Sequence, residues 1–411
     1  PYSFGGDAMY VYRLSNALAQ RGHFVDVFHC KNAFDLLQTK AAPIDDEDDF
    51  PNHGQVRVMT LDSRAGFLSP LAAQQTGTSF FKRKIKDALE NNSYDVVHYH
   101  NISLIGITSL SYGSGSSSPA KGLKEKPVKL YTTHEHWLIC PMHTLWKFDR
   151  EVCEKKDCTA CQIAGNRPPQ FWRHTKLLEN NLRNLDCLIS PSRFTLKKHL
   201  DDGIKVPAAV IPNFSQLPAD INSETKFGIK PYFLFVGRLE KIKGLQNLIP
   251  IFGTLPEYDL YVAGDGAYES ELKQQAKEFS NIKFLGKFNQ SQLQSAYRQA
   301  AALIVPSICY ETFGMVIIEA FAMKTPAIVN NLGALPELIE ESGGGFVYSN
   351  NDELVQAIKA LAGHQTTRDE LGLKGYQAFL KYWQEEAHIS KYFTLIEKIQ
   401  DQKISSEFLR K

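Results

Sequence analysis

The feature that most constrains the fold is a repeated alternation of short apolar runs with segments of helical spacing. Residues 8–21, "AMYVYRLSNALAQR", carry apolar side chains at helical spacing and end before Gly22. Residues 24–30, "FVDVFHC", then form an apolar run of strand length. Further runs of this kind are 94–100, 128–134 and 185–192. Apolar strands that alternate with helices predict a parallel β-sheet covered by helices on both faces.

The same alternation begins again near Tyr232. Between this point and residue 330, five apolar runs alternate with helical segments. They are "YFLFVGR", "YDLYVAG", "IKFLG", "ALIVPS" and "PAIVN". This second series predicts a second doubly wound α/β domain, with the seam between the two domains in residues 206–231.

Length supports two domains, because 411 residues are too many for one ordinary hydrophobic core. We predict a first domain over residues 1–212 and a second over 213–388, each of the doubly wound α/β type. Residues 352–362 and 367–399 have helical patterns. We expect the last segment, 389–411, to be a helix that packs back on the first domain.

Composition excludes some classes of protein. Lys and Arg total 46 against 45 Asp and Glu, which argues against a protein built mainly to bind nucleic acid. No apolar run approaches the roughly 18 residues of a membrane span. The basic stretch 80–89, "FFKRKIKDAL", suits either peripheral contact with anionic lipid or a solvated helix face, and the solvated face is commoner. Seven cysteines without a visible signal peptide indicate a reducing compartment, so we expect a cytoplasmic protein, with the inner face of the membrane left open.

Two carboxylates stand in an otherwise apolar stretch. Between residues 300 and 336 the only charged side chains are Glu311, Glu319 and Lys324. Glu311 follows a strand and precedes a helix that opens near Gly314, so it lies at the carboxyl edge of the predicted sheet, where open α/β sheets bind ligands. The first amides of that helix form an anion site. A buried carboxylate needs a partner, so we interpret both as ligand-binding groups, although a lone Glu is more often tied to a backbone N–H or a basic residue.

Two cations follow the strand that begins the second domain. The sequence "FVGRLEKIKG" places Arg238 just past the strand and Lys243 five residues later, before Gly244. Both could converge on a diphosphate, Arg as a fork and Lys as a point charge. Either alone is more often a solvated surface cation. The Gly-Asp-Gly of "VAGDGAYE" is a weak signal for the same site.

Taken together, the chain resembles the family 4 retaining glycosyltransferases (glycosyl transferases group 1) of the GT-B fold, in which two Rossmann-like domains face each other across a cleft. The resemblance covers nearly the whole chain, and its most specific part is the Glu-x7-Glu stretch with "FG" after its first Glu. The motifs that carry it are "SFGGDAMYVYRLSNALAQRGHFVDVF", "YDVVHYHN", "TTHEHW", "PSRF", "VIPNFS", "FVGRLEKIKG", "VAGDG", "IKFLGKF", "VPSICYETFGMVIIEAFAMKTPAIV" and "NNLGALPELI".

The resemblance implies an acceptor-binding first domain, a nucleotide-sugar-binding second domain, and a role for several residues. Gly6, in the Gly-Gly turn, would let the backbone approach the donor phosphates. Arg238 and Lys243 would hold the diphosphate and stabilise the leaving group. Glu311 would bind hydroxyls of the donor sugar, and Glu319 those of the ribose.

It also implies contacts around these residues. The backbone amides that would reach sugar and phosphate are those of Phe313, Gly314 and Met315. Lys287 and Phe288 lie where the family places the base, and His134 matches the histidine near the sugar and the incoming acceptor.

The sequence departs from the family pattern at three places. Thr312 stands where Pro or Gly is usual, which is a small change. The usual His-Asp pair is His134-Glu135, so Glu135 receives no role. The family's first strand, ahead of the Gly-Gly turn, is absent, so we expect the first sheet to lack a strand.

Four cysteines cluster within 140–161, a segment that we interpret as an insertion in the first domain. Their spacing, x12, x4 and x2, suits a tetrahedral Zn²⁺ site and also part of a plant-type [2Fe–2S] pattern. The cysteines are Cys140, Cys153, Cys158 and Cys161. His136 and His143 are spare candidate ligands. A structural zinc ion is favoured modestly over iron–sulfur, disulfides or free thiols, and the cluster would shape the acceptor side.

The resemblance therefore implies a retaining glycosyltransferase, and the cations at the donor site lead us to expect catalysis without a metal. It would move a sugar from a UDP- or GDP-sugar to a saccharide, lipid-linked or small-molecule acceptor. Two alternatives stay open: a nucleotide-sugar epimerase of the same fold, and a non-catalytic protein that binds sugar nucleotides. The base, the sugar, the acceptor and the linkage are not specified by the residues.

Overall fold

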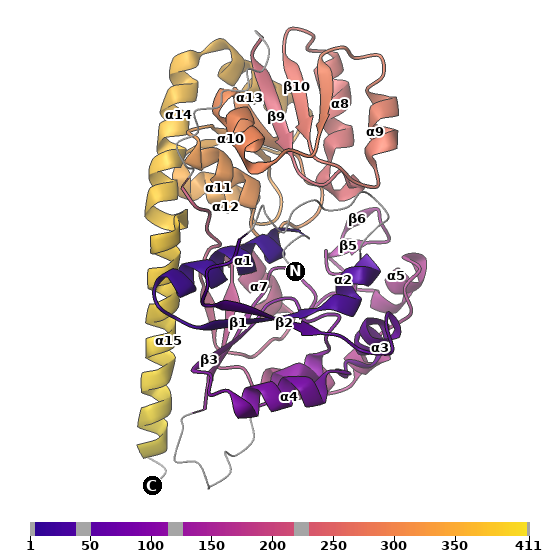
Figure 1. Ribbon diagram of the computed structural model, residues 1–411. Helices are drawn as coiled ribbons and strands as arrows, with labels where there is room; N and C mark the ends of the chain where they lie inside the picture. Colours follow the sequence, from indigo (N-terminus) through magenta and orange to yellow (C-terminus); the bar gives the residue numbers. More distant parts are fainter. Residues whose placement is uncertain (1–4, 38–50, 114–125, 218–229, 409–411) are drawn as a thin grey trace.

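The computed structural model of the protein describes residues 5–37, 51–113, 126–217 and 230–408. The chain forms two α/β halves, one above the other in Figure 1, and its last helix runs along the lower half. The polar end of the predicted seam, 218–229, lies outside the described residues.

The second half is built on six parallel strands in the order β11-β10-β9-β12-β13-β14. The strands are β9 (Tyr232–Val236), β10 (Asp259–Ala263), β11 (Ile282–Gly286), β12 (Ala302–Val305), β13 (Ala327–Asn330) and β14 (Gly345–Tyr348). The helices between and after them are α8 (Leu245–Gly253), α9 (Glu269–Gln275), α10 (Gln290–Gln299), α11 (Met315–Ala322), α12 (Leu335–Ser342) and α13 (Asn351–Gly363).

Both faces of this sheet are buried, which is why its strands have continuous apolar runs. In β9, Tyr232 and Leu234 belong to the core on one face, and Phe233 and Phe235 belong to the core on the other. The strand order reverses at β9, since β10 lies on one side of it and β12 on the other. The loops that leave β9 and β12 therefore lie at the switch point, the position at which open α/β sheets bind ligands.

The first half contains two parallel sheets. Strands β1 (Val25–Cys30) and β2 (Val56–Leu61) pair with each other. The other sheet has the order β3-β4-β7-β8 and consists of β3 (Val96–Tyr99), β4 (Val128–Thr132), β7 (Cys187–Ser190) and β8 (Ala208–Val210). Among the described strands, β1 and β3 do not pair, so each is the edge of its own sheet.

Helices pack around these two sheets. They are α1 (Gly5–Gln20), α2 (Lys31–Leu37), α3 (Leu68–Thr76), α4 (Lys82–Asn91), η1 (Ile107–Ser111), η2 (Phe171–His174), α6 (Leu177–Leu182) and α7 (Arg193–Asp201). In α4, Ile85 and Ala88 are buried while the basic side chains are exposed, an arrangement that both interpretations of this stretch share.

The cysteine-rich segment forms a small substructure of its own. Strands β5 (Trp146–Lys147) and β6 (Glu151–Val152) form an antiparallel hairpin, and α5 (Cys158–Ala164) follows it.

The C-terminal region differs from the single helix predicted for 367–399. It consists of α14 (Gln365–Ala378), a π-helical turn η4 (Phe379–Trp383) and α15 (Glu385–Phe408). The helix is interrupted because the backbone of Ser215 pairs there, with its N–H donating to the carbonyl of Trp383 at 3.0 Å.

Helix α15 lies against the first half of the chain (Figure 1). Tyr392, Ile396 and Ile399 pack in one cluster with Val128 and Leu130 of β4. Nearby, Lys403 Nζ lies 2.6 Å from a carboxylate oxygen of Asp186. No helix in the described ranges is at once long enough and apolar enough to cross a membrane.

Candidate functional site

The two loops at the switch point are in direct contact. Gly244 has φ +76, and a Cβ on it would lie 2.0 Å from the carbonyl oxygen of Pro306. The N–H of Ile308 donates to the carbonyl of Ile242 at 2.9 Å. Only glycine allows the loop after β9, with its 3-10 turn η3 (Lys241–Lys243), to approach the loop after β12 this closely.

This contact brings together Lys243 and Glu311, which the sequence placed at one site. Lys243 Nζ lies 2.7 Å from Glu311 Oε1, and Ser307 Oγ donates to the same oxygen at 2.6 Å. Burial alone would raise the pKa of Glu311, but the Lys243 charge and the two hydrogen bonds hold it below its ordinary value. Burial alone would lower the pKa of Lys243, and the Glu311 carboxylate raises it. Both groups are therefore charged at neutral pH.

Arg238 lies at the rim of the same loop. Its side chain is 64% exposed and forms an ion pair with Glu240 at 2.9 Å. Its charge also acts on Glu311 and Lys243. An exposed guanidinium with one surface partner can turn toward a bound anion at little cost.

Glu319 has a partner that the sequence did not predict. Arg13 of α1 lies with its Nη2 3.0 Å from Glu319 Oε1, although the two residues belong to different halves of the chain. The side chain of Arg13 is only 11% exposed. One signal was available: Arg13 falls between Tyr10 and Ala17, on the face of the helix that is buried.

The start of α11 lies against the start of α1. Gly314, with φ +126, precedes Met315, the first residue of α11, while Phe313 is buried. A Cβ on Gly6 would lie 3.7 Å from the side chain of Met315. The predicted Gly-Gly turn is in fact the first turn of helix α1, Gly5–Gln20, so its free amides belong to a helix N-terminus.

Lys287 and Phe288 follow β11, two strands away from β9 in the sheet. Lys287 is exposed, and Phe288 is half-buried against the core cluster. Both lie beyond the carboxyl end of a strand, at the same edge of the sheet as the other candidates.

His134 lies where the halves meet. Its backbone carbonyl accepts a hydrogen bond from Thr312 Oγ1 at 2.9 Å, and its Nε2 lies 3.0 Å from His100 Nδ1. Burial, with the neighbouring His98 and His388, lowers the pKa of His134 to about 3. The imidazole is therefore neutral at physiological pH and can exchange hydrogen bonds without carrying charge.

Thr312 has a larger part than the sequence suggested. Its hydroxyl reaches His134, and its carbonyl accepts from Ser192 Oγ at 2.7 Å and Thr195 Oγ1 at 3.0 Å. Three hydrogen bonds from one residue join the loop after β12 to the first half. A proline or glycine at this position would lack the hydroxyl. The hydrogen bond to His134 therefore exists only because the chain departs from the family pattern here.

Two carboxylates of the first half complete the surroundings. Glu135 Oε2 lies 2.8 Å from His143 Nδ1. Burial raises the pKa of Asp7, and the charge of Glu135 adds to the effect. The two groups are close enough to interact, and neither was predicted as a site residue.

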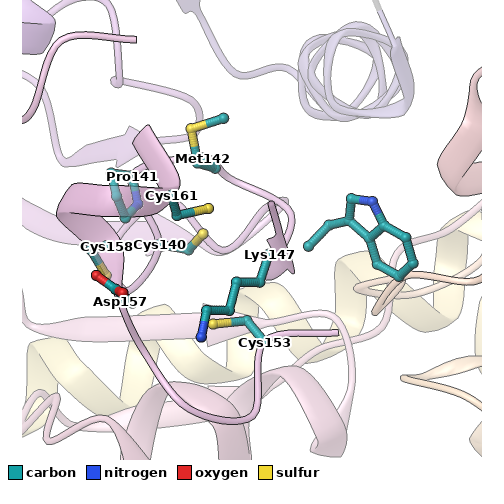
Figure 2. A pocket seen from close by; sticks show the side chains of 9 residues that line it. Cys140, Pro141, Met142, Lys147, Cys153, Asp157, Cys158 and Cys161 are labelled. Atoms are coloured by element: carbon teal, nitrogen blue, oxygen red, sulfur yellow. The ribbon is translucent and has the colours of Figure 1, made fainter. Parts of the chain in front are cut away.

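The four clustered cysteines line one pocket, together with Pro141, Met142, Trp146, Lys147 and Asp157 (Figure 2). None of the four forms a disulfide. Burial raises the pKa of Cys140 to about 11, so this thiol is not a reactive nucleophile. The spare histidines do not line the pocket. Within the described ranges, no three His, Cys, Asp or Glu side chains are already arranged to hold an ion.

Comparison with known proteins identifies the family. The sequence model of glycosyltransferase family 4 matches residues 4–215, and that of glycosyl transferases group 1 matches residues 218–404. The first match alone covers 212 of the 411 residues.

The chain belongs to glycosyltransferase family 4.

The resemblance drawn from the sequence is thereby confirmed. Among curated proteins, the chain is 34% identical over 145 residues to an uncharacterized glycosyltransferase of Methanocaldococcus jannaschii. That match covers 33% of this chain and 37% of the relative, well under two thirds of its length.

Solved structures confirm the GT-B fold with its two Rossmann-like domains. Sucrose-phosphate synthase from Thermosynechococcus elongatus is similar with a TM-score of 0.69 at 20% identity, over 97% of this chain and 94% of that one. HepE from Anabaena, in complex with UDP, has a TM-score of 0.61 at 18% identity, over 99% and 98%.

Proposed function

We propose that this protein is a retaining glycosyltransferase that moves a sugar from a nucleotide-diphosphate donor to a saccharide, lipid-linked or small-molecule acceptor. The observation that carries the proposal is the hydrogen-bonded cluster of Lys243, Ser307 and Glu311 at the switch point of the six-stranded sheet. The cluster holds a cation and a carboxylate side by side at a ligand-binding edge. A phosphate with an attached sugar needs both kinds of group.

The leaving group would be a nucleoside diphosphate, on which negative charge grows as the glycosidic bond breaks. Lys243, Arg238 and the N-terminal amides of α11 would oppose this charge where it develops. These groups would supply the stabilisation that a divalent cation supplies elsewhere, so we infer that catalysis needs no metal.

Glu311 would bind hydroxyls of the transferred sugar and hold it in place, and would not act as the nucleophile. Its charged state is maintained by Lys243 and Ser307, so it accepts hydrogen bonds at neutral pH. When the diphosphate takes Lys243 as a partner, one side of the carboxylate becomes free for the sugar.

Glu319 would bind the ribose hydroxyls after exchanging its ion pair with Arg13. The pair lies between the halves, so the exchange would couple nucleotide binding to the contact of α1 with α11.

The acceptor would approach from the side of the first half, near His134. Because His134 is neutral, it would orient hydroxyl groups and would not deliver a proton. In a same-face reaction the departing phosphate takes the proton of the acceptor hydroxyl, the new bond forms on the face that the leaving group vacates, and the configuration is retained.

Other features support finer parts of the proposal. The UDP complex of HepE favours a UDP-sugar, with a GDP-sugar as the other candidate. Seven cysteines, none of them in a disulfide, suit a cytoplasmic location.

The proposal is tested by incubating the protein with a panel of UDP- and GDP-sugars, with and without saccharide and lipid-linked acceptors. Release of nucleoside diphosphate that depends on an acceptor, with a glycosylated product of matching mass and retained anomeric configuration by NMR, is the expected result. A changed sugar nucleotide without any acceptor would indicate the epimerase instead. Saturable binding with no conversion across the panel would indicate the non-catalytic protein.

A further inference from the structure

We propose that Cys140, Cys153, Cys158 and Cys161 form a structural site for one Zn²⁺ ion. The site lies outside the donor-binding residues, and the proposal does not depend on glycosyl transfer.

The first observation is convergence. The thiols come from the loop before β5, the end of β6 and the first turn of α5, and they line one pocket. In the view of Figure 2 the sulfur atoms of Cys140 and Cys161 are neighbours, and those of Cys153 and Cys158 lie farther from this pair. Beside the four thiols, the lining includes two charged side chains, Lys147 and Asp157.

The second observation is that backbone amides already point at the sulfur atoms. The N–H of Phe148 donates to Cys161 Sγ at 3.4 Å. The N–H groups of Met142 and Leu145 lie near the sulfur of Cys140 and favour its thiolate form. Hydrogen bonds from amides to a metal-bound thiolate orient the ligand and disperse its charge, as outer partners of metal ligands do generally.

The backbone that supplies these amides is strained. His143, Leu145, Phe148 and Asp149 all have positive φ, between 51° and 72°, within seven residues. Each left-handed non-glycine residue costs on the order of 1 kcal/mol, so such a run persists only where something else holds it. A bound ion that fixes thiols on both sides of the hairpin would hold it.

The third observation is charge. Four thiolates around Zn²⁺ carry a net charge of −2, which must be offset. The charges of Lys147 and Lys156 act on Cys153, and those of Lys156 and Arg173 act on Cys158. The substructure thus already contains the cations that the complex requires.

Binding of zinc would have to draw the thiols together, since no three ligands among the described residues are already arranged around an ion. Cys140 and Cys161 are buried, whereas Cys153, just after β6, and Cys158, at the start of α5, are half-buried. We expect the two half-buried side chains to be the ones that move when the ion binds.

The site would also connect the first half with the donor loop. Lys241 Nζ lies 2.8 Å from the backbone carbonyl and 3.1 Å from Oδ2 of Asp149, at the tip of the β5–β6 hairpin. Lys241 begins η3, the turn that ends at Lys243. Given the proposed function, loss of the ion should raise the KM for the donor more than it lowers kcat.

The experiment is elemental analysis of the resting protein, purified without added metal, which needs no substrate and so fails separately from the proposed function. We expect about one Zn per chain, and after exchange the visible spectrum of tetrahedral Co²⁺ with thiolate ligands. Cys158→Ser should lose at least half of the bound zinc, because it removes one of the four ligands. The variant should still fold, because that thiol is half-buried and its replacement leaves no large cavity. Cys30→Ser, a buried cysteine of β1 outside the cluster, should keep all of it.

Three results would overturn the proposal. The first is a purified protein that contains no metal by elemental analysis and in which all seven thiols react with a thiol reagent after denaturation. The second is a pair of disulfides among the four cysteines, seen by mass spectrometry without reduction. The third is about two Fe per chain with acid-labile sulfide, which would make the site an iron–sulfur centre. If Cys158→Ser does not fold, zinc content and the cobalt spectrum of the unmodified protein still decide.

Discussion

Acidification should destabilise this protein steeply, because it buries histidines in their neutral form. Burial lowers the pKa of His134 to about 3, that of His136 to about 3 and that of His388 to about 4. Burial also lowers the pKa of His98, His100 and His199. In the unfolded chain each has an ordinary pKa of about 6.5.

The direction follows from proton binding. Below pH 6.5 the unfolded chain takes up protons that the folded protein does not, so the free energy of unfolding falls as the pH falls. Above pH 6.5 these histidines are neutral in both states and cause no loss of stability. At pH 5 each such histidine favours the unfolded chain by about 2 kcal/mol, from 1.5 pH units at about 1.4 kcal/mol per unit. At pH 5, His134, His136 and His388 together lower the free energy of unfolding by about 6 kcal/mol. This is comparable with the whole stability of an ordinary domain, about 5–15 kcal/mol.

The assay is urea unfolding followed by tryptophan fluorescence at pH 8, 6 and 5. His388→Gln should reduce the loss of unfolding free energy between pH 8 and pH 5 by about 2 kcal/mol. His364→Gln is the matched control, because that side chain is exposed, and it should leave the loss unchanged. Equal stability at pH 8 and pH 5, or the same loss in His388→Gln as in the unmodified protein, would refute the reasoning.

Two further predictions concern the donor loop. Arg238→Ala should lower kcat/KM by at least about 10²-fold, measured with the donor found in the panel, because one preorganised donor to a developing charge has that effect; turnover close to normal at saturating donor would contradict its role. Gly244→Ala should abolish nucleotide binding in calorimetry and lower the melting temperature, since its Cβ would lie 2.0 Å from Pro306 O. The control is Gly22→Ala, with φ +90 and nothing within 4 Å, which should cost only about 1–2 kcal/mol of stability. Equal effects of the two variants would show that the loop contact is unimportant.

The sequence was informative where a local pattern alone determines the secondary structure or the place of a residue in the sheet. Apolar runs fully buried on both faces predicted the parallel sheets. Glu311 and Lys243 each follow one of those strands, which predicted that both belong to one donor site, because parallel strands present their carboxyl ends at one edge. The ion pair between them was not predicted.

The sequence was less informative where a structural feature depends on contact with a distant segment of the chain. The interruption at Gln384 depends on pairing with Ser215, and the helical pattern around it continues without a break. The partner of Glu319 is Arg13, 306 positions away, and the helical pattern that places Arg13 on a buried face does not say which carboxylate it meets. The neutral state of His134 likewise results from burial near two distant segments, around His98 and His388.

The measurement that tests the central claim most directly is calorimetric titration of bare UDP and GDP into Glu319→Gln and Glu311→Gln. If Glu319 binds the ribose, Glu319→Gln should weaken the bare nucleotide by about 1.5–3 kcal/mol, or roughly one to two decades in Kd. Glu311→Gln should leave that affinity nearly intact, because its sugar partner is absent and Lys243 is released for the diphosphate. Arg13→Met is the control: if Glu319 served only to hold Arg13, this variant would lose as much affinity as Glu319→Gln. Weaker binding in Glu311→Gln together with unchanged binding in Glu319→Gln would contradict the account.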